Sequence, residues 1–329
     1  MEHDLIAARY LSDNERFADL INGYGFGGEQ IIAAEDLSEM DTRSGLWQAE
    51  MKDGFASSPS EQSISRRGKK RKTKYRDLIR KAAFGINFAV IGIENQEEVH
   101  YLMPLRIMNY DVDEYQRQAA EIKKEVRGKK GIKRSEFLSG FLKTNRLQPC
   151  MTLVLYYGND WDGGKSLYEI LDFSGIPDEF KGLVNDYPIH LLEIKKIEDT
   201  SVFKTDLKQV FDFIRCSEDK EKLKALVEGD EAFQNMDEAA YDMAVSHANA
   251  TQMIEKKKYR ERGGKVDMCK ALEDWMEEER MLGIEQGIEQ GIEKGIEQVI
   301  KNMLRNNISI EEINKMTNIS IDIIKKFCN

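Results

Sequence analysis

The chain has 329 residues, of which 41% are hydrophobic and 33% are charged, and its formal net charge is -10. This length and apolar content are sufficient for one large domain or two of ordinary size, which excludes a wholly disordered polypeptide. The negative net charge excludes a protein whose entire surface binds nucleic acid, so any polyanion-binding surface has to be local.

The sequence shows no sign of a membrane or secretory segment. No apolar run reaches the roughly 18 residues that span a bilayer, and MEHDLIAARY has neither the basic nor the apolar region of a signal peptide. We therefore expect a cytoplasmic protein with no membrane partner. The cysteines (Cys150, Cys216, Cys269, Cys328) are far apart and the histidines (His3, His100, His190, His247) form no set with metal-ligand spacing, so neither a zinc site nor a disulfide framework is indicated.

The first predicted element is a helix in SDNERFADLINGYGFGG. Ser12 is placed to cap it, an apolar stripe follows at helical spacing, and the glycines from Gly23 onward are expected to end it. Glu15 and Asp19 lie four residues apart on one face of this helix. Residues 36–73 have weak periodicity and many Ser and Gly residues, which predicts a loop.

Two strands are predicted next, near residues 75–81 and 87–95, with a glycine turn between them. A helical pattern follows over residues 108–126. Residues 151–157 then predict another strand, because the run is β-branched and aromatic and is followed by Gly and Asn. The predicted order is helix, strand, strand, helix, strand.

The C-terminal part begins with a charged, helix-favouring segment, residues 205–282. Residues 283–298 then repeat GIE plus Gln or Lys four times. On a helix, a period of four places the Ile residues on a slanting stripe. Each Gly costs the helix roughly 1 kcal/mol relative to Ala, and the Glu residues repel one another at i, i+4. The repeat therefore fits either an adjustable spacer or a weak oligomerisation stem.

The tail holds two short units that each begin with a capping serine. Ser309 and Glu312 form an S-x-x-E capping box, and Ser320 opens the second unit. Two short helices joined by the turn MTN resemble a small helix-turn-helix, a geometry that can place a helix in DNA. Because many helical hairpins have this pattern, simple packing or self-association is favoured over DNA contact.

Three polar residues could carry chemistry. Asp77 belongs to the first predicted strand, and Glu94 and Gln96 end the apolar strand FAVIGIENQ on one face. If the strands pair, the two carboxylates converge as oxygen ligands of the kind that Mg²⁺ prefers. Such an ion polarises phosphoryl oxygens and lowers the pKa of a bound water. The alternative is that Glu94 and Gln96 mark where the strand leaves the core, and that Asp77 forms an ion pair with a nearby Arg or Lys.

A basic run, RRGKKRKTKYR, directly precedes Asp77. It is either a solvated loop or an arm that contacts DNA phosphates and supplies salt-sensitive affinity. Arg106, beyond the second strand, either binds a phosphate or neutralises Asp111 or Asp113. The candidate DNA-binding residues are Arg66, Arg67, Lys69, Lys70, Arg71, Lys72, Lys74, Arg76 and Arg106.

Four segments together resemble the Rpn family of recombination-promoting nucleases and transposase-like proteins, a branch of the PD-(D/E)xK nuclease superfamily. They are NERFADLIN, RDLIRK with IENQ, MPLRIMNYDVDEY, and PCMTLVLYYGNDWDGGKSL. The last is the most specific, because P-x-x-x-L-V-x-Y-x-G followed by Trp recurs in the family. The repeat and the helical tail are also similar to the C-termini of many members. The likeness covers residues 1–215 well and the tail loosely.

The resemblance implies an α/β fold. Its core would be the restriction-endonuclease-like α-β-β-β-α-β arrangement, with a further strand near 75–105 and a mostly helical C-terminal extension. The expected parts are a nuclease-like domain at 1–215, a helical extension at 216–282, a repeat helix or spacer at 283–298, and a helix-turn-helix-like tail at 299–329.

The resemblance also implies a DNA endonuclease that depends on Mg²⁺ or Mn²⁺, hydrolyses phosphodiester bonds, and promotes recombination or serves mobile elements. Asp77 and Glu94 match the two acidic motif positions and would bind the metal. Gln96 stands where most of the superfamily has Lys, and an amide can orient water but supplies no positive charge. Glu15 and Asp19 are candidates for the additional acid that the first helix often contributes.

Two alternatives follow from other features. The substitution of Gln96 for Lys favours a catalytically weak or inactive DNA-binding or regulatory protein that retains the nuclease fold. The repeat and tail favour a module that forms homo-oligomers through its C-terminal helices.

Overall fold

The computed structural model describes residues 2–40, 77–84, 87–248 and 264–327. It has two compact units, Met1–Met268 and Cys269–Asn329. The predicted boundary at residue 215 falls inside a helix of the first unit. Within the described ranges, no helix has both the length and the apolar content needed to cross a bilayer.

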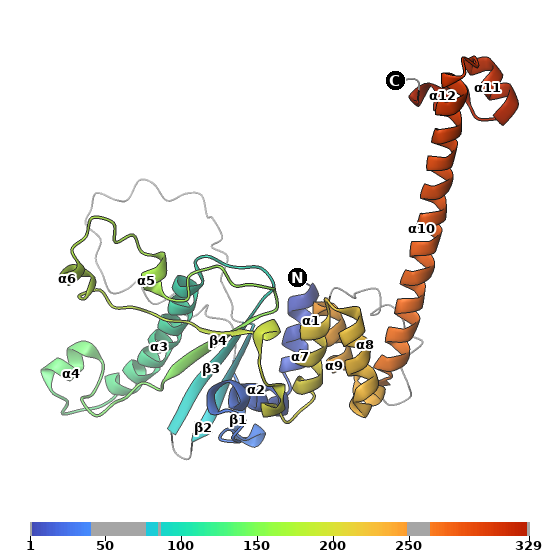
Figure 1. The fold of residues 1–329 in the computed structure, drawn as a ribbon. Coiled ribbons are helices and arrows are strands. Elements are labelled where there is room, and N and C mark those ends of the chain that lie inside the picture. The colour runs from blue at the N-terminus through green and yellow to red at the C-terminus, as the bar shows by residue number, and fades with distance from the viewer. Residues whose placement is uncertain (1, 41–76, 85–86, 249–263, 328–329) are drawn as a thin grey trace. The chain divides into compact units, whose positions relative to one another are not determined.

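A mixed sheet of five strands, in the order β1-β2-β3-β4-β5, forms the centre of the first unit (Figure 1). Its strands are β1 (Leu37–Glu39), β2 (Leu78–Phe84), β3 (Asn87–Gln96), β4 (Cys150–Tyr156) and β5 (His190–Glu193). The first three strands pair antiparallel, whereas β4 runs parallel to both β3 and β5. Parallel neighbours require a crossover connection, and the chain between β3 and β4 supplies one with a long helix, α3 (Met103–Arg127).

The described elements therefore include the order helix, strand, strand, strand, helix, strand, and the α/β class is confirmed. The further strand that completes this order is β1, which lies outside the range 75–105 where it was expected. The sequence did not indicate β1, because a strand of three residues with two exposed side chains has no alternating apolar pattern. Asp77 directly precedes β2, and residues 41–76, which include most of the predicted loop, lie outside the described residues.

Two helices precede the sheet in the chain, α1 (Glu2–Leu11) and α2 (Asn14–Phe26). The N-cap of α2 is Asp13 and not the predicted Ser12, because the Asp13 carboxylate accepts hydrogen bonds from two backbone N–H groups of the first turn. The helix also continues past Gly23. A Cβ at Gly23 would lie 2.3 Å from the ring of Phe203, so this glycine permits close packing, while Gly27, with a φ of 61°, ends the helix.

Helix α3 packs against β4 through an apolar face. Met103, Ile107 and Tyr110 are buried against Val154, Tyr156 and Trp161. The helix begins five residues before the predicted start, because Pro at its first turn needs no backbone donor there.

A group of helices completes the first unit: α7 (Leu207–Cys216), α8 (Lys220–Gly229) and α9 (Glu238–His247) (Figure 1). Helix α9 packs against α1 and α7, and α1 also contacts β3, so the first helix of the chain is enclosed by its later helices. The short elements are α4 (Arg134–Ser139), α5 (Leu167–Ile170), α6 (Asp178–Lys181), β6 (Met236–Asp237), β7 (Lys265–Val266), and the 3-10 turns η1 (Ala34–Asp36), η4 (Ile194–Lys196), η5 (Thr200–Val202) and η6 (Glu231–Asn235).

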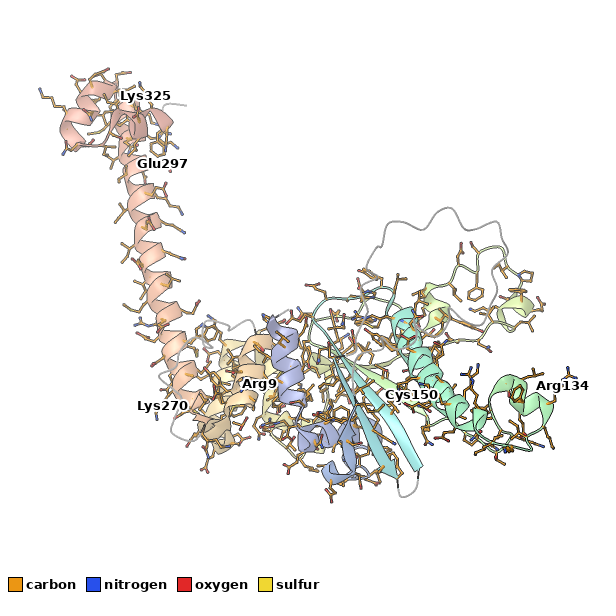
Figure 2. The ribbon with its side chains drawn as sticks, turned by 180° about the vertical axis from the view of Figure 1, so that it is seen from behind. Arg9, Arg134, Cys150, Lys270, Glu297 and Lys325 are labelled. Carbon is orange, nitrogen blue, oxygen red and sulfur yellow. The ribbon has the colours of Figure 1, made fainter. Side chains whose placement is uncertain are left out.

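The second unit consists of α10 (Met268–Arg305), α11 (Ile310–Thr317) and α12 (Ile321–Lys326). The repeat is part of α10, which has 38 residues and is therefore about 57 Å long at 1.5 Å per residue. Residues 281–295 are all exposed, and their side chains project on every side of the helix (Figure 2). The predicted caps at Ser309 and Ser320 are confirmed, and the two short helices pack on the end of α10 through buried Ile residues.

Candidate functional site

Asp77 and Glu94 stand opposite each other on adjacent strands. The antiparallel register pairs Leu78 with Ile93, so the next positions outward are Asp77 and Glu94. Directly opposed residues of an antiparallel pair have Cβ atoms about 4.5–5.5 Å apart and share one face of the sheet. The hairpin of β2 and β3 therefore brings together the two acids that the sequence singled out.

Asp77 is fixed by the end of β3. Its Oδ2 accepts hydrogen bonds from the backbone N–H of Asn95 at 2.7 Å and from the Asn95 side-chain amide at 3.2 Å. The Asn95 side chain in turn accepts a hydrogen bond from the buried Tyr157 hydroxyl at 2.9 Å. Burial raises the pKa of Asp77, and the two hydrogen bonds from Asn95 only partly offset that effect.

Glu94 is fully buried and forms an ion pair with Arg106 of α3. Gln96 lies on the same face, since its Nε2 donates to Glu94 Oε1 at 3.2 Å, as strand alternation predicts. The same Nε2 donates to the carbonyl of Asn95 at 2.6 Å. Both contacts use the side-chain amide nitrogen of Gln96, so neither uses its side-chain oxygen.

Arg106 links both carboxylates electrostatically. Burial alone would lower the pKa of Arg106, but the charges of Glu94 and Asp77 and a hydrogen bond to Tyr110 raise it. Tyr110 is held protonated, because burial and the charge of Glu94 raise its pKa to about 12. Arg106 pairs with Glu94, and Asp111, one of its predicted partners, accepts hydrogen bonds from Thr152 and from the Tyr187 hydroxyl.

A third acid, Asp4 of α1, also acts on this site. Its charge raises the pKa values of both Asp77 and Tyr157, so Asp4 lies within electrostatic reach of the strand pair. Sequence reasoning missed it. Asp4 is an exposed residue of α1, and only the packing of α1 against β3 brings its charge near the strand pair, so no local pattern indicated it.

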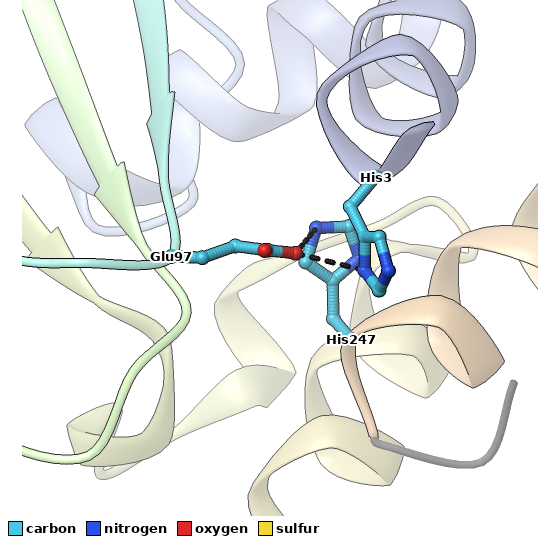
Figure 3. Close-up of side chains that lie close together, drawn as sticks. All are labelled: His3, Glu97 and His247. Atoms are coloured by element: carbon cyan, nitrogen blue, oxygen red, sulfur yellow. Dashed lines mark ion pairs between the residues drawn. The ribbon is translucent and has the colours of Figure 1, made fainter. Parts of the chain in front are cut away.

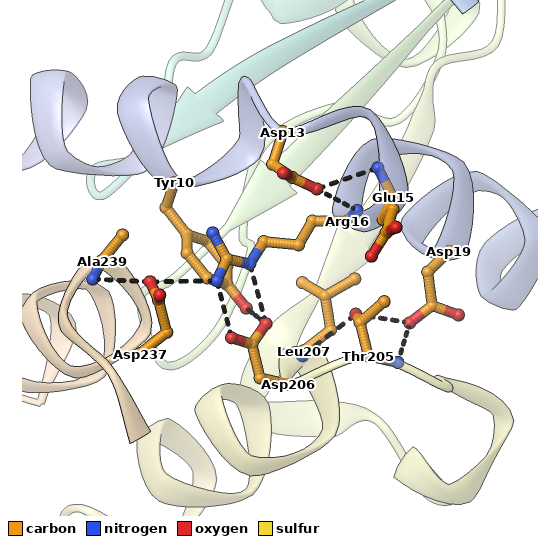
Figure 4. Close-up of polar contacts among 10 residues, drawn as sticks. All are labelled: Tyr10, Asp13, Glu15, Arg16, Asp19, Thr205, Asp206, Leu207, Asp237 and Ala239. Carbon is orange, nitrogen blue, oxygen red and sulfur yellow. Dashed lines mark hydrogen bonds and ion pairs between the residues drawn. The ribbon is translucent and has the colours of Figure 1, made fainter. Parts of the chain in front are cut away.

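The acids predicted from the next helix have other contacts. Asp19 is buried and accepts hydrogen bonds from the backbone N–H of Lys204 at 2.8–2.9 Å. It also accepts from the backbone N–H and the hydroxyl of Thr205, each at 2.7 Å (Figure 4). It therefore organises the turn before α7. Glu15, four residues earlier, is exposed to solvent.

The neighbouring Arg16 joins three helices. Its guanidinium donates twice to Asp206 at 2.8 Å and pairs with Asp237 at 3.1 Å (Figure 4). Asp206 also accepts a hydrogen bond from Tyr10. These acids stand at the N-termini of α7 and α9, so this network is a structural tie between α2 and the later helices.

Among the described residues, His3, Glu97 and His247 form one group of possible metal ligands, whose ligand atoms all lie within 4.8 Å of one another (Figure 3). They come from α1, from the residue after β3, and from the end of α9. Positions 3, 97 and 247 share no local pattern, which is why the sequence did not indicate the group. The predicted basic arm, residues 66–76, lies outside the described residues.

Comparison with known proteins does not identify the chain: no family model matches it, and neither a curated protein nor a solved structure gives a significant match.

The strand pair offers the carboxylate oxygens of Asp77 and Glu94, which are donors of the kind that Mg²⁺ and Mn²⁺ accept.

Proposed function

We propose that the protein is a metal-dependent DNA endonuclease with a restriction-endonuclease-like core. The observation that carries the proposal is the opposition of Asp77, the residue before β2, and Glu94 of β3, with Arg106 of α3 paired to Glu94. Carboxylates at the end of hydrogen-bonded strands are held in fixed positions, which a catalytic metal site requires. The family resemblance of the sequence supports the same reaction, hydrolysis of a phosphodiester.

In this proposal, Asp77 and Glu94 bind Mg²⁺ or Mn²⁺. A bound ion of this kind supplies positive charge to phosphoryl oxygens and lowers the pKa of water. The Asn95 contacts to Asp77 keep its carboxylate in one orientation, and the Arg106 pair does the same for Glu94. Both acids are thereby arranged before substrate arrives, which reduces the reorganisation needed for catalysis.

Gln96 orients the attacking water in this scheme. Its amide nitrogen is occupied by Glu94 and by a backbone carbonyl, so its Oε1 is the atom that can accept a hydrogen bond from water. A lysine at this position could only donate. The positive charge that Gln96 lacks is supplied from another element, because Arg106 places a guanidinium beside Glu94.

The experiment is cleavage of supercoiled plasmid by purified protein with Mg²⁺ or Mn²⁺, compared with Asp77→Asn and Glu94→Gln. We expect each substitution to reduce the rate at least about 100-fold, since loss of a direct ligand should exceed the 10- to 100-fold cost typical of outer contacts. Glu98→Gln, an exposed acid just beyond β3, is the matched control and should cleave like wild type. Absence of wild-type cleavage with both metals, or cleavage that survives both substitutions, would reject the proposal.

A second candidate function is DNA binding without cleavage. It is favoured by the ion pair itself, because Arg106 occupies Glu94 and competes with a metal for the same carboxylate. In that case, wild type and Asp77→Asn would shift DNA equally in a gel assay, and neither would nick plasmid with Mg²⁺ or Mn²⁺. The C-terminal helices would then serve assembly or targeting.

A further inference from the structure

The group formed by His3, Glu97 and His247 has the separations of a metal-binding set. His3 Nδ1 lies 2.8 Å from Glu97 Oε1, and His247 Nε2 lies 3.8 Å from the same oxygen. In a tetrahedral site with metal–ligand distances near 2.0–2.1 Å, neighbouring donor atoms are about 3.3 Å apart. These two separations lie on either side of this value, and all the ligand atoms of the group lie within 4.8 Å of one another, so side-chain adjustment could bring the three donors onto one ion (Figure 3).

The orientation of His247 is set by its own helix. Its Nδ1 lies 3.1 Å from the backbone carbonyl of Met243 and 2.8 Å from the Ser246 hydroxyl, which itself donates to that carbonyl. We assign the hydrogen of neutral His247 to Nδ1, because the Met243 carbonyl oxygen beside it only accepts. The lone pair of neutral His247 is therefore on Nε2, on the side of Glu97. Metal-ligating histidines commonly have this arrangement, with the other ring nitrogen donating to a carbonyl.

This arrangement places two acceptors against each other. With this assignment, neither Nε2 nor the Glu97 oxygen 3.8 Å away can donate a hydrogen bond to the other, and a cation between them would bind both. A metal ion would satisfy the imidazole, the carboxylate and His3 together.

We infer that His3, Glu97 and His247 form a second metal site, for a divalent transition-metal ion of the Zn²⁺ type, separate from the site of Asp77 and Glu94. Two imidazoles and one carboxylate favour Zn²⁺ or a similar ion over Mg²⁺, which prefers oxygen donors. Three protein ligands leave the fourth tetrahedral position for water. His3 and Glu97 are partly exposed, at 31% and 43% of their side-chain area, so an ion can enter from solvent.

The site would join three segments that are distant in sequence. It connects α1, the end of β3 and the end of α9, which already pack together. The ring of Tyr157 contacts that of His247 at a tilt of 43°, with centroids 4.1 Å apart, and its hydroxyl donates to Asn95, which positions Asp77. A bound ion would therefore stiffen the support of the proposed catalytic acid without touching it.

The test is titration of metal-free full-length protein with Co²⁺ and Zn²⁺, following the visible absorption of Co²⁺ and competition of Zn²⁺ with a chromophoric chelator. We expect one equivalent to bind, with a tetrahedral Co²⁺ spectrum. His3→Gln and Glu97→Gln should each weaken Zn²⁺ binding at least about 100-fold, beyond the cost of losing an outer contact. Zn²⁺ should raise the Tm of wild type by several degrees and that of the two variants little.

Two controls separate this inference from the proposed function and from other ligands. Asp77→Asn should bind Zn²⁺ like wild type even if it abolishes cleavage, and His190→Gln removes a histidine outside the group. Wild-type Zn²⁺ affinity in His3→Gln and Glu97→Gln, as expected if cysteine thiols bind the ion, would overturn the inference. Failure of wild type to bind one equivalent of either ion would overturn it as well.

Discussion

Arg106 places a positive charge against the buried carboxylate of Glu94 and within the field of Asp77. Removing one partner of a buried ion pair leaves an uncompensated charge, so Arg106→Gln should lower the free energy of unfolding by about 3 kcal/mol in EDTA. Mg²⁺ should then stabilise the variant more than wild type, because the ion replaces the missing cation. Urea unfolding with EDTA and with Mg²⁺ measures both effects.

The control for this prediction is Arg134→Gln, which removes an exposed arginine from α4. It should change stability little, and Mg²⁺ should affect it as it affects wild type. An equal response to Mg²⁺ in wild type, Arg106→Gln and Arg134→Gln would mean that the ion does not bind at Glu94.

The carboxyl group of Glu193 should make the stability of the fold depend on pH. Burial alone would raise the pKa of Glu193, but hydrogen bonds from Lys196 at 2.7 Å, Lys165 at 3.0 Å and the Trp161 N–H at 3.2 Å outweigh it and lower the pKa. A lowered folded-state pKa contributes stability above the unfolded-state pKa of about 4.3, and this contribution is lost as pH falls through the folded-state value.

Glu193→Gln should therefore lower the Tm at pH 7, and the difference from wild type should close as the pH falls below about 4. Thermal unfolding of both proteins across this range measures the difference, with Glu98→Gln as an exposed control. A gap between wild type and Glu193→Gln that stays constant with pH would show that the carboxylate charge does not contribute.

At the scale of elements, the sequence predicted what local patterns encode. Strands β3 and β4 have dense apolar runs, and the Ser309 capping box specifies a helix start within four residues. The opposition of Asp77 and Glu94 was also within reach, because an antiparallel hairpin relates its two strands by simple counting. Strand β1 was not, since three residues become a strand only through pairing with β2.

The partners of Arg106 and of His3 depended on tertiary packing. From the sequence, the expected partner of Arg106 was a phosphate, Asp111 or Asp113. In the structure α3 packs against the sheet, and Arg106 pairs with Glu94. His3 meets His247 because α1 packs on α9, a contact between opposite ends of the first unit's chain. Neither contact produces a periodic pattern in the sequence, so neither could be predicted from it.

Helix α10 leads to a prediction about assembly. Ile288 and Ile292 are each 59% exposed within one stripe of the repeat, an apolar surface that a second copy of the helix would cover. We propose that the chain self-associates through this stripe. Replacing both Ile residues by Gln should lower the mass in solution, measured by light scattering. The control, Glu289→Gln with Glu293→Gln on the same helix turns, should leave the mass unchanged. Equal masses for wild type and the Ile variant would show that the chain does not self-associate through this stripe.

At the scale of the whole molecule, a net charge of -10 opposes binding to DNA, so affinity has to come from a local cationic surface. The basic arm at residues 66–76 is the proposed surface. Each phosphate contact contributes about -0.9 to the slope of log K against log salt concentration for duplex DNA. Converting three arm lysines to Gln should therefore make the slope less steep by up to about 2.7, and should weaken binding at every sequence alike.

A control with the same change in charge separates the arm from net charge. Three lysines of α8 can be replaced by Gln in the same way, and both triple variants make the formal charge more negative by three. The two sets are Lys69, Lys70, Lys72 in the arm, and Lys220, Lys222, Lys224 in α8. Made in an Asp77→Asn background and measured in EDTA, only the arm set should change the slope, because counterion release depends on contacts and not on total charge. Equal changes in the slope for both sets would mean that the arm does not contact the phosphates specifically. DNA affinity would then have to come from another surface of the first unit.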